Sequence, residues 1–462
     1  MALPRASCDD RSMTRPEPAP EASVLLSFRA ENVRSFRSEV EFSLLATGMA
    51  ESNVVRYVKW RQGGNPIGVL PVGGIFGANA SGKTNLLKAM DDMRFQVLHS
   101  FRTGSPTGGI WRRPFLLDPA CQGTPSRFEV DLVLHGVRHE YGFAVDDERV
   151  LEEWAFHYPR GRAALLFQRR GSDVELGPAA RAKGRAAMAL LRQNALFLST
   201  AASANHSVLL PLYGWFERNL VLAEADSRAF RQAFTAQMLD NSTRREQVLA
   251  MLHSADLGIS GATKHEYDAK TKERVQRAIR ILTGKEGEPE GGEDGPDFEQ
   301  LLVQLTHQGV DSNIELRASD ESLGTLVWFG LVGPIIHALA EGSVFLVDEL
   351  DASLHPALVA QLVQLFQSPD TNPRRAQLIF NSHDATLLGD TVSDRGIGRD
   401  QIWFTEKRPD GSTHLYPLSD LDPRKEEAIG RRYLAGCYGA TPILSREQFA
   451  AIAELITASG NR

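Results

Sequence analysis

Short apolar runs with strand-like spacing fill the first part of this chain, and one clear helical pattern interrupts them. Residues 23–33 and 38–47 predict two strands, and in the second run apolar and polar side chains alternate, as expected when one face is buried. An apolar run over 69–77 ends in glycines, and the segment 83–99 has helical spacing. This order of strand, glycines and helix is the first feature that bears on function.

A β-hairpin is predicted over 127–147, where alternating apolar positions flank a His135-Gly136 turn. Strand-like sequence continues to Phe167, and the pattern from 177 to 282 is mainly helical. We therefore expect an antiparallel β subdomain followed by a helical insertion.

Helices and wholly apolar strands alternate in the last third of the chain. A helical stretch over 326–340 precedes an apolar strand at 344–347, and a second helix precedes another strand at 377–380. Such alternation is typical of a parallel sheet with crossover helices. The predicted fold class is α/β, with a mainly parallel sheet, an antiparallel β subdomain and a helical insertion.

Composition shifts along the chain suggest four segments. Residues 284–297 are rich in Gly, Pro and acidic residues, which is typical of a flexible linker and also of a solvated loop without a role. The expected segments are a disordered tail (1–22), an N-terminal lobe (23–176), a helical insertion with the acidic linker (177–298) and a C-terminal lobe (299–462).

Overall composition is that of a globular protein with a mild acidic excess. The chain has 462 residues, 42% of them hydrophobic, and a net charge of -7, which does not indicate nucleic-acid binding but leaves room for a local basic patch. Its three cysteines, Cys8, Cys121 and Cys437, are far apart and show no disulfide or zinc spacing. We find no run of about 18 apolar residues and no signal-peptide core in 1–22, so we expect a cytoplasmic protein without a membrane partner.

The glycine-rich segment after the 69–77 strand fits the pattern G-x-x-x-x-G-K-[ST]. Its glycines let backbone amides approach phosphate, and the following helix adds the positive end of its dipole. Lys83 is expected to reach the β and γ phosphates of ATP, and the Thr84 hydroxyl to ligate Mg²⁺. The nucleotide-binding residues predicted here are Gly77, Ala78, Asn79, Ala80, Ser81, Gly82, Lys83, Thr84 and Asn85.

Two carboxylates follow the 344–347 strand. The carboxyl end of a buried parallel strand borders the nucleotide crevice. We expect Asp348 to hold magnesium, directly or through water, and Glu349 to act as general base on the attacking water. Asp351 follows as a candidate D-loop residue.

Two histidines lie near the ends of these elements. His383 follows the 377–380 strand, where an imidazole can contact the γ-phosphate, although a lone histidine is more often structural. The order of phosphate loop, Asp-Glu and Ser-His favours the functional role, so we count His383 with Lys83 and Glu349 among the catalytic residues. For His355 a structural and a site-organising role are equally open.

Small polar residues open the helical stretch at 326–340. The segment Ser319 to Thr325 lies about 20 residues before Asp348, which is the position of an ABC signature motif. In that branch the signature helix of one subunit points its N-terminus at the nucleotide of the other. The alternative is a plain helix cap by Ser319 or Ser322. The signature residues expected at the nucleotide are Ser322, Gly324 and Thr325.

With these motifs in view, the chain resembles bacterial ABC/SMC-like predicted ATPases of the RloA and AriA kind. The matching pieces run from residue 23 to about 444 and include FRAENVRSF, FGANASGKTNLLKAM, ESLGT, LVDELDASLHP, NSHDATLL and RRYLAGCYGATPIL. The resemblance implies a P-loop NTPase of the ABC/SMC head type that couples ATP and Mg²⁺ to anti-phage defence or abortive infection. It also implies an ATP-sandwiched homodimer or higher oligomer, and a separately encoded nuclease or toxin effector.

Two departures from the wider ABC pattern matter. The signature is ESLGT rather than LSGGQ, which argues against an ordinary transporter subunit. A Q-loop glutamine is not evident, and Gln122 is the nearest candidate. About 80 residues follow His383 without an acidic cluster of nuclease spacing, so we expect any nuclease to act in trans.

The alternative function is a DNA-repair ATPase similar in its head to RecF and SMC proteins. It would need a DNA-binding face, and the basic residues between Arg160 and Arg192 are its candidate, against the ordinary interpretation as a solvated surface. These residues are Arg160, Arg162, Arg169, Arg170, Arg181, Lys183, Arg185 and Arg192.

Overall fold

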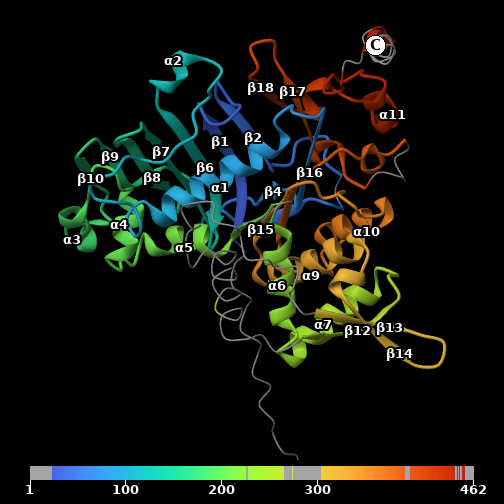
Figure 1. Ribbon diagram of the computed structural model, residues 1–462. Helices are drawn as coiled ribbons and strands as arrows, with labels where there is room; N and C mark the ends of the chain where they lie inside the picture. Colours follow the sequence, from blue (N-terminus) through green and yellow to red (C-terminus); the bar gives the residue numbers. More distant parts are fainter. Residues whose placement is uncertain are drawn as a thin grey trace, which may run out of the picture.

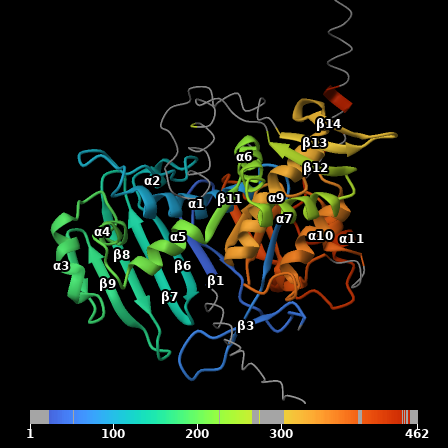
Figure 2. The same ribbon diagram turned by 90° about the horizontal axis from the view of Figure 1, so that it is seen from below.

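The computed structural model describes residues 23–51, 53–224, 227–264, 303–390 and 396–442, together with residues 273, 445, 447 and 450–452. Two sheets lie side by side in it and form two lobes (Figures 1 and 2). The expected tail (1–22) and the acidic linker (284–297) lie outside the described residues.

The first lobe is built on a seven-stranded antiparallel sheet in the order β10-β9-β8-β7-β6-β1-β2. Its turn between β6 and β7 has φ of 48° at His135 and 74° at Gly136, both left-handed, which matches the right-handed twist of a two-residue hairpin. The predicted hairpin is therefore confirmed. The strands are β1 (Val24–Glu31), β2 (Val40–Ser43), β6 (Ser126–Leu134), β7 (Val137–Val145), β8 (Val150–His157), β9 (Ala164–Arg170) and β10 (Asp173–Leu176).

The second lobe contains a six-stranded sheet in the order β11-β15-β16-β5-β17-β18. Its first five strands are parallel and only β18 runs antiparallel, so five carboxyl ends meet at one edge. The expected α/β fold with a mainly parallel sheet is confirmed. The strands are β5 (Val72–Gly77), β11 (Leu220–Ala223), β15 (Val344–Val347), β16 (Gln377–Ser382), β17 (Ile402–Lys407) and β18 (Thr413–Pro417).

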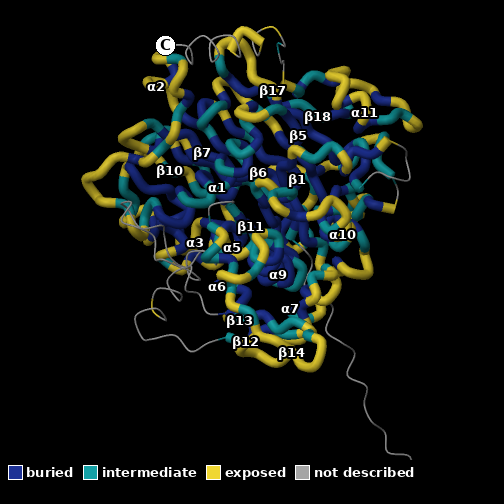
Figure 3. Tube along the Cα trace, turned by 45° about the vertical axis from the view of Figure 1, so that its right-hand side comes forward, coloured by how far each residue is buried: buried dark blue, intermediate teal, exposed yellow. Residues whose placement is uncertain are grey.

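Both faces of this six-stranded sheet are buried, because successive side chains of a strand point to opposite faces. Ile75, Leu346 and Ile379 pack into the core shared with the antiparallel sheet. Phe345 and Phe380 pack on the other face, against the helices that follow the insertion. Burial concentrates along these strands and along α9 in Figure 3.

Helices cover the sheets and carry the loops of the site. Helix α1 begins at Lys83 and ends at His99, as the sequence pattern predicts. The helices are α1 (Lys83–His99), α2 (Pro119–Gln122), α3 (Arg181–Leu190), α4 (Phe197–Ser203), α5 (Leu210–Arg218), α6 (Arg228–Met238), α7 (Ser242–His253), α9 (Leu323–Glu341), α10 (Pro356–Gln367) and α11 (Ile429–Leu434), with 3-10 turns η3 (Ala318–Asp320), η4 (Ala385–Leu388), η5 (Arg399–Gln401) and η6 (Leu418–Leu421).

The region expected to be a helical insertion also contains strands. It holds α3 to α7, but Leu220–Ala223 is strand β11, which pairs in parallel with β15 and so belongs to the central sheet. This run of four residues is too short for its period to separate strand from helix, and the neighbouring β15 supplies the partner that decides. The segment Ile259–Lys264 is likewise a strand, β12. Unlike β11 it lies outside the central sheet, and it pairs with β13 (Val303–Gln308).

Two small sheets complete the described fold. Strands β12, β13 and β14 (Asn313–Arg317) form a three-stranded antiparallel sheet beside α7 and α9 (Figures 1 and 2). Strands β3 (Arg56–Val58) and β4 (Ile67–Val69) form a ribbon that leads into β5.

Helix α9 corrects one expectation. With a mean hydropathy of 1.7 over an 18-residue window, this helix of 19 residues is long and apolar enough to cross a membrane by length and composition, whereas the sequence analysis found no such run. In the fold 61% of that window is buried, and Trp328, Val332 and Ile335 are nearly inaccessible. The apolar character of α9 is therefore that of a core helix.

Candidate functional site

Three loops at the carboxyl edge of the six-stranded sheet bring the predicted residues together. The segment 77–82 follows β5, Asp348 and Glu349 follow β15, and His383 follows β16. They border a cleft of about 890 Å³. The cleft is lined by Arg34, Ser35, Asn79, Ala80, Gly82, Lys83, Thr84, Asn85, Arg112, Arg113, Pro114, Phe115, Leu116, Leu117, Glu349, Asn381, His383, Lys407 and Gly411.

The phosphate loop has a backbone that only small residues permit. Gly82 has φ of 106°, and a Cβ placed there would lie 2.1 Å from Thr413 Oγ1. Ala80 is also left-handed, at 60°. Strands β17 and β18 hold the loop from behind, since Thr413 Oγ1 donates to Ser81 O at 2.8 Å and Ser81 Oγ lies 2.6 Å from Thr405 Oγ1. The loop is thus fixed from segments more than 300 residues away.

Lys83 closes the phosphate loop on itself. Its Nζ donates to Gly77 O at 2.8 Å and Ala78 O at 3.0 Å, and the residue is 6% exposed. Burial lowers the pKa of Lys83 to about 8, and the carboxylates of Asp351, Glu349 and Asp348 oppose that shift. The ammonium group is therefore a poorly hydrated cation next to the cleft.

Thr84 and Asp348 meet as the sequence predicts for a magnesium site. Thr84 Oγ1 donates to Asp348 Oδ1 at 2.8 Å. One carboxylate with a hydroxyl and phosphate oxygens is the ligand set that Mg²⁺ takes in nucleotide sites, where it keeps several waters. The pair fits such an ion. Groups of three or more His, Cys, Asp or Glu with metal spacing do not occur in the described part of the chain.

Asn381 is a site residue that sequence reasoning missed. Its Nδ2 donates to Asp348 Oδ1 at 2.6 Å and to Thr84 Oγ1 at 3.3 Å, and its Oδ1 accepts from Glu349 N at 2.5 Å. The side chain is 1% exposed. One amide therefore fixes Thr84, Asp348 and the backbone of Glu349. The available signal was a polar residue at the carboxyl end of an apolar strand.

Glu349 has an unusual backbone for a glutamate. Its φ is 53°, in the left-handed region that costs a non-glycine residue about 1 kcal/mol or more. The hydrogen bond from Glu349 N to Asn381 holds that conformation, and the side chain lines the cleft. The residue is exposed to solvent there, which leaves its carboxylate free to meet a water molecule.

His383 and Asp351 sit against Lys83. Lys83 Nζ lies 3.4 Å from His383 Nδ1, and burial and that cation hold the pKa of His383 below its ordinary value. The imidazole is then neutral at pH 7, and with Nδ1 accepting, Nε2 carries the proton. The Asp351 carboxylate accepts from His383 N at 3.2 Å, so it orients the histidine loop and is not among the residues that line the cleft.

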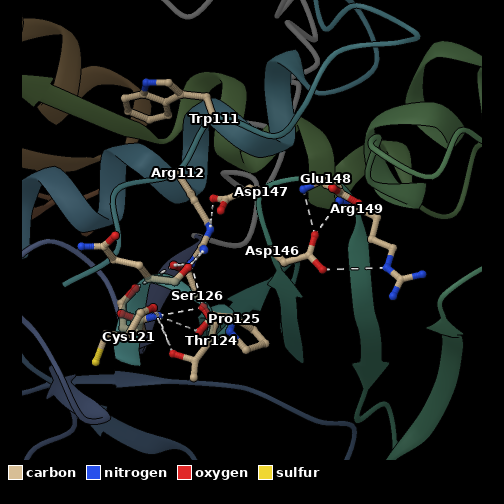
Figure 4. Close-up of polar contacts among 12 residues, drawn as sticks. Trp111, Arg112, Cys121, Thr124, Pro125, Ser126, Asp146, Asp147, Glu148 and Arg149 are labelled. Atoms are coloured by element: carbon tan, nitrogen blue, oxygen red, sulfur yellow. Dashed lines mark hydrogen bonds and ion pairs between the residues drawn. The ribbon is translucent and has the colours of Figure 1, made fainter. Parts of the chain in front are cut away.

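The wall of the cleft opposite these groups comes from the segment 112–117. The side chain of Arg112 is 2% exposed, and its guanidinium pairs with Asp147 at 2.6 Å and donates to Thr124 O (Figure 4). The same guanidinium donates to Gln122 O. These contacts tie the wall to the antiparallel sheet. Gln122, the Q-loop candidate, contributes its carbonyl to this anchor and does not line the cleft.

Asn32 adds a second anchor for the same wall. Its Oδ1 accepts from Phe115 N at 3.0 Å and its Nδ2 donates to Cys121 O at 2.7 Å. It has φ of 51° and is 3% exposed. The asparagine of the FRAENVRSF motif therefore joins β1 to the cleft.

The signature turn lies outside the cleft of its own subunit. Ser322 caps α9, with Oγ accepting from Thr325 N at 3.1 Å, and neither residue borders the cleft. A Cβ on Gly324 would lie 2.7 Å from Ser353 O, so a larger residue would push the turn away from the segment that follows Asp351. The cap expected as the alternative is present, and in the turn Ser322 and Leu323 are exposed while Thr325 is buried.

Two other sequence candidates have structural contacts. His355 caps α10, since its Nδ1 accepts from Ala357 N at 3.2 Å, and it does not border the cleft. In the basic run, Arg169 is 1% exposed and donates to Ala195 O at 2.6 Å, and Arg192 donates to Ser100 O and Phe101 O. The eight cations therefore do not share one solvent face.

The chain is similar to several proteins of known structure. Among solved structures the chain is similar to the SMC head domain from Thermotoga maritima, with 11% identity over 85% of this chain and 98% of that chain, at a TM-score of 0.36. It is also similar to the Smc head domain with an extended coiled coil bound to the C-terminal domain of ScpA, derived from Pyrococcus furiosus, with 13% identity over 87% and 98%, at 0.36. The comparison with curated proteins finds no match.

A family model described as "AAA domain, putative AbiEii toxin, Type IV TA system" matches residues 74–389. That range is more than half of the chain. It spans the phosphate loop, the signature turn, Asp348 and Glu349, and His383, which are the groups that the fold places around the cleft and at the start of α9. The chain belongs to this family of AAA domains.

Proposed function

We propose that this protein binds and hydrolyses ATP between two of its own subunits and uses the cycle as a switch. The observation that carries the proposal is that one subunit supplies only some of the groups expected around the nucleotide. One subunit assembles Lys83, Thr84, Asp348 and Glu349 around a single cleft, while its own signature turn does not line that cleft.

In the bound state Lys83 would leave the carbonyls of Gly77 and Ala78 and donate to the phosphates of ATP. The exchange is favourable because a desolvated ammonium gains more from an anionic oxygen than from a neutral carbonyl. Thr84 and Asp348 would hold Mg²⁺, which neutralises charge on the phosphate oxygens. Asn381 keeps both ligands in place throughout.

Hydrolysis then rests on Glu349 and His383. The Glu349 carboxylate accepts a proton from the attacking water, whose oxygen forms the new bond to the γ-phosphorus as the bond to ADP breaks. The neutral His383 can donate from Nε2 to a γ-phosphate oxygen, because Nδ1 faces Lys83. Loss of that phosphate would remove the contact, so the histidine loop reports the state of the site.

The second half of each site would come from the partner subunit. The first turn of a helix presents unpaired N–H groups and the positive end of the dipole, both of which favour phosphate. Ser322, Gly324 and Thr325 of α9 lie in such a turn, outside their own cleft. ATP bound between subunits would thus join a phosphate loop to a signature turn.

We further propose that the switch acts in abortive infection or anti-phage defence in the cytoplasm, through a separately encoded nuclease or toxin. The family description, which names a putative AbiEii toxin of a type IV TA system, supports a toxin-related role. The separate effector is proposed from the resemblance to RloA- and AriA-like ATPases alone. A DNA-repair role has less support, since Arg169 of the basic run is buried and Arg192 is half-buried and bonded to Ser100 O.

The deciding experiment compares tagged wild type, Glu349→Gln and Lys83→Ala, each with and without ATP and Mg²⁺. We expect Glu349→Gln to accumulate as an ATP-dependent dimer and Lys83→Ala to remain unassociated, as measured by light scattering after size exclusion. In pull-downs from host cells, a nuclease or toxin-like protein whose occupancy differs among the three variants supports the defence switch. Recovery of DNA and recombination proteins without a dedicated partner would favour the repair ATPase.

A further inference from the structure

Glu321 is a nearly buried carboxylate directly before the signature turn. Its side chain is 4% exposed, and Ser322, the cap of α9, follows it in the chain. A carboxylate in this position presents negative charge beside a turn that, in the proposed function, receives the γ-phosphate of the partner's ATP. Uncompensated, it would repel that phosphate, and burial would make the carboxylate itself costly.

His307 supplies the compensation. Its Nε2 donates to Glu321 Oε1 at 2.7 Å, and its side chain is 23% exposed. The imidazole comes from the middle strand of the small β12–β14 sheet, where His307 lies opposite Ile259 on one side and Ile314 on the other. Because strand pairing on both sides fixes the position of His307 along the sheet, the hydrogen bond from its imidazole also fixes the position of the Glu321 carboxylate.

The contact joins strand β13 to the residue that directly precedes the cap of α9. Strand β14 runs into η3, and Glu321 N donates back to Ala318 O at 3.3 Å before the cap begins. On its other side the turn packs on Ser353, through Gly324. The position of the signature turn is thus set from the small sheet on one side and from the loop after β15 on the other.

We propose that His307 is a positioning residue for the signature turn: it holds and compensates the Glu321 carboxylate so that the turn can receive a phosphate from the partner subunit. This role rests on the proposed ATP sandwich. It predicts a pattern that a merely structural contact would not give. Removing the imidazole should harm association between subunits, and removing the charge of Glu321 as well should restore it.

The test uses a Glu349→Gln parent, in which stalled hydrolysis lets ATP-bound dimers accumulate. Into it are placed His307→Ala, His307→Gln, Glu321→Gln and the double variant His307→Ala with Glu321→Gln. His253→Ala, at an exposed histidine of neighbouring α7, is the matched control. Each protein is measured for binding of a fluorescent ATP analogue as monomer, for ATP-dependent dimer dissociation constant by sedimentation, and for thermal unfolding.

We expect His307→Ala to weaken the ATP-dependent dimer about tenfold, the factor for loss of a hydrogen bond to a charged group, with nucleotide binding by the monomer unchanged. His307→Gln keeps a donor and should stay near the parent, as should Glu321→Gln and His253→Ala. The double variant should recover most of the loss, because the uncompensated charge is gone. If His307→Ala fails to fold, the other variants still decide.

Three outcomes would overturn the role of His307. In the first, His307→Ala has the same dimer dissociation constant as the parent. In the second, the double variant dimerises as weakly as His307→Ala. In the third, His307→Gln with ATP dimerises no better than the parent does without ATP. Failure of the parent itself to dimerise with ATP would remove the sandwich and this role with it. The two failures are told apart by the parent measurement alone.

Discussion

The carboxyl edge of the six-stranded sheet and the first turn of α9 both present groups that suit phosphate, and they differ in completeness. At the sheet edge, Thr84, Asp348 and Asn381 already satisfy one another at 2.6 to 3.3 Å. At α9 the turn is capped by Ser322, and Ser322, Gly324 and Thr325 are not among the residues that line the cleft. The difference teaches that the sheet edge completes its hydrogen bonds within one subunit, whereas the proposed sandwich would bring the first turn of α9 to a nucleotide held by a second.

The largest expected effect is on ATP turnover, and it tests Glu349 at the carboxyl edge of the six-stranded sheet. Glu349→Gln should lower ATP turnover by about 10²- to 10⁴-fold, the range for loss of a general base, while nucleotide binding persists. Phosphate release under saturating ATP measures it. Glu341→Gln, at the exposed end of α9, is the control and should keep wild-type turnover. Turnover of Glu349→Gln equal to wild type would place the base elsewhere.

Lys83→Ala should weaken nucleotide binding about 100-fold, since it removes a desolvated cation that would meet the phosphates. Titration of a fluorescent ATP analogue gives the constant. Lys88→Ala changes a lysine of the same helix that pairs with Glu224 at 3.1 Å, and it should bind normally. Equal losses in the two variants would mean that helix charge, not the loop contact, matters.

Asn381→Ala should lower magnesium-dependent turnover about 10- to 100-fold, the usual effect of losing a residue that orients metal ligands. A magnesium titration at fixed ATP should show a raised requirement for the ion. Asn313→Ala on the exposed β14 strand serves as control. If magnesium dependence is unchanged and only the unfolding temperature drops, Asn381 is a packing residue.

The pH dependence sharpens the view of Lys83. In the free protein its pKa is about 8, so the cation is present below that pH and is lost above it. ATP affinity should be flat below about pH 8 and fall about tenfold per unit above it, with proton uptake on binding. Calorimetry in buffers of different ionisation enthalpy detects the uptake. Lys83→Arg stays charged throughout and should abolish the inflection.

The smallest effect tests the turn of α9. Ser322→Ala should cost about 1 kcal/mol of stability as a lost helix cap and weaken ATP-dependent association about fivefold, with binding by the monomer intact. Asn241→Ala removes the equivalent cap of α7, where Asn241 accepts from Arg244 N. It should lose similar stability with no change in association. If both variants associate equally, Ser322 is only a cap.

Local signals in the chain predicted the phosphate loop, α1 and the strands at 344–347 and 377–380 well, because each depends on neighbours in sequence. Where a segment needs a distant partner, the pattern misleads. Strand β11 is recognisable only beside β15, and Arg169 looks like surface charge until Ala195 and Glu153 are seen around it.

By itself the sequence determined the family, the phosphate loop and the order of Lys83, Asp348, Glu349 and His383. Within each motif, phosphate chemistry requires fixed residue types at short spacing, and such a pattern can be recognised without the fold. Only the tertiary structure decided that Asn381 joins the magnesium pair to Glu349, and that the Ser322 turn lies away from its own cleft. The physical reason is that hydrogen bonds between separate strands depend on sheet order. That order is set by burial on both faces of the sheet, and no spacing along the chain records it.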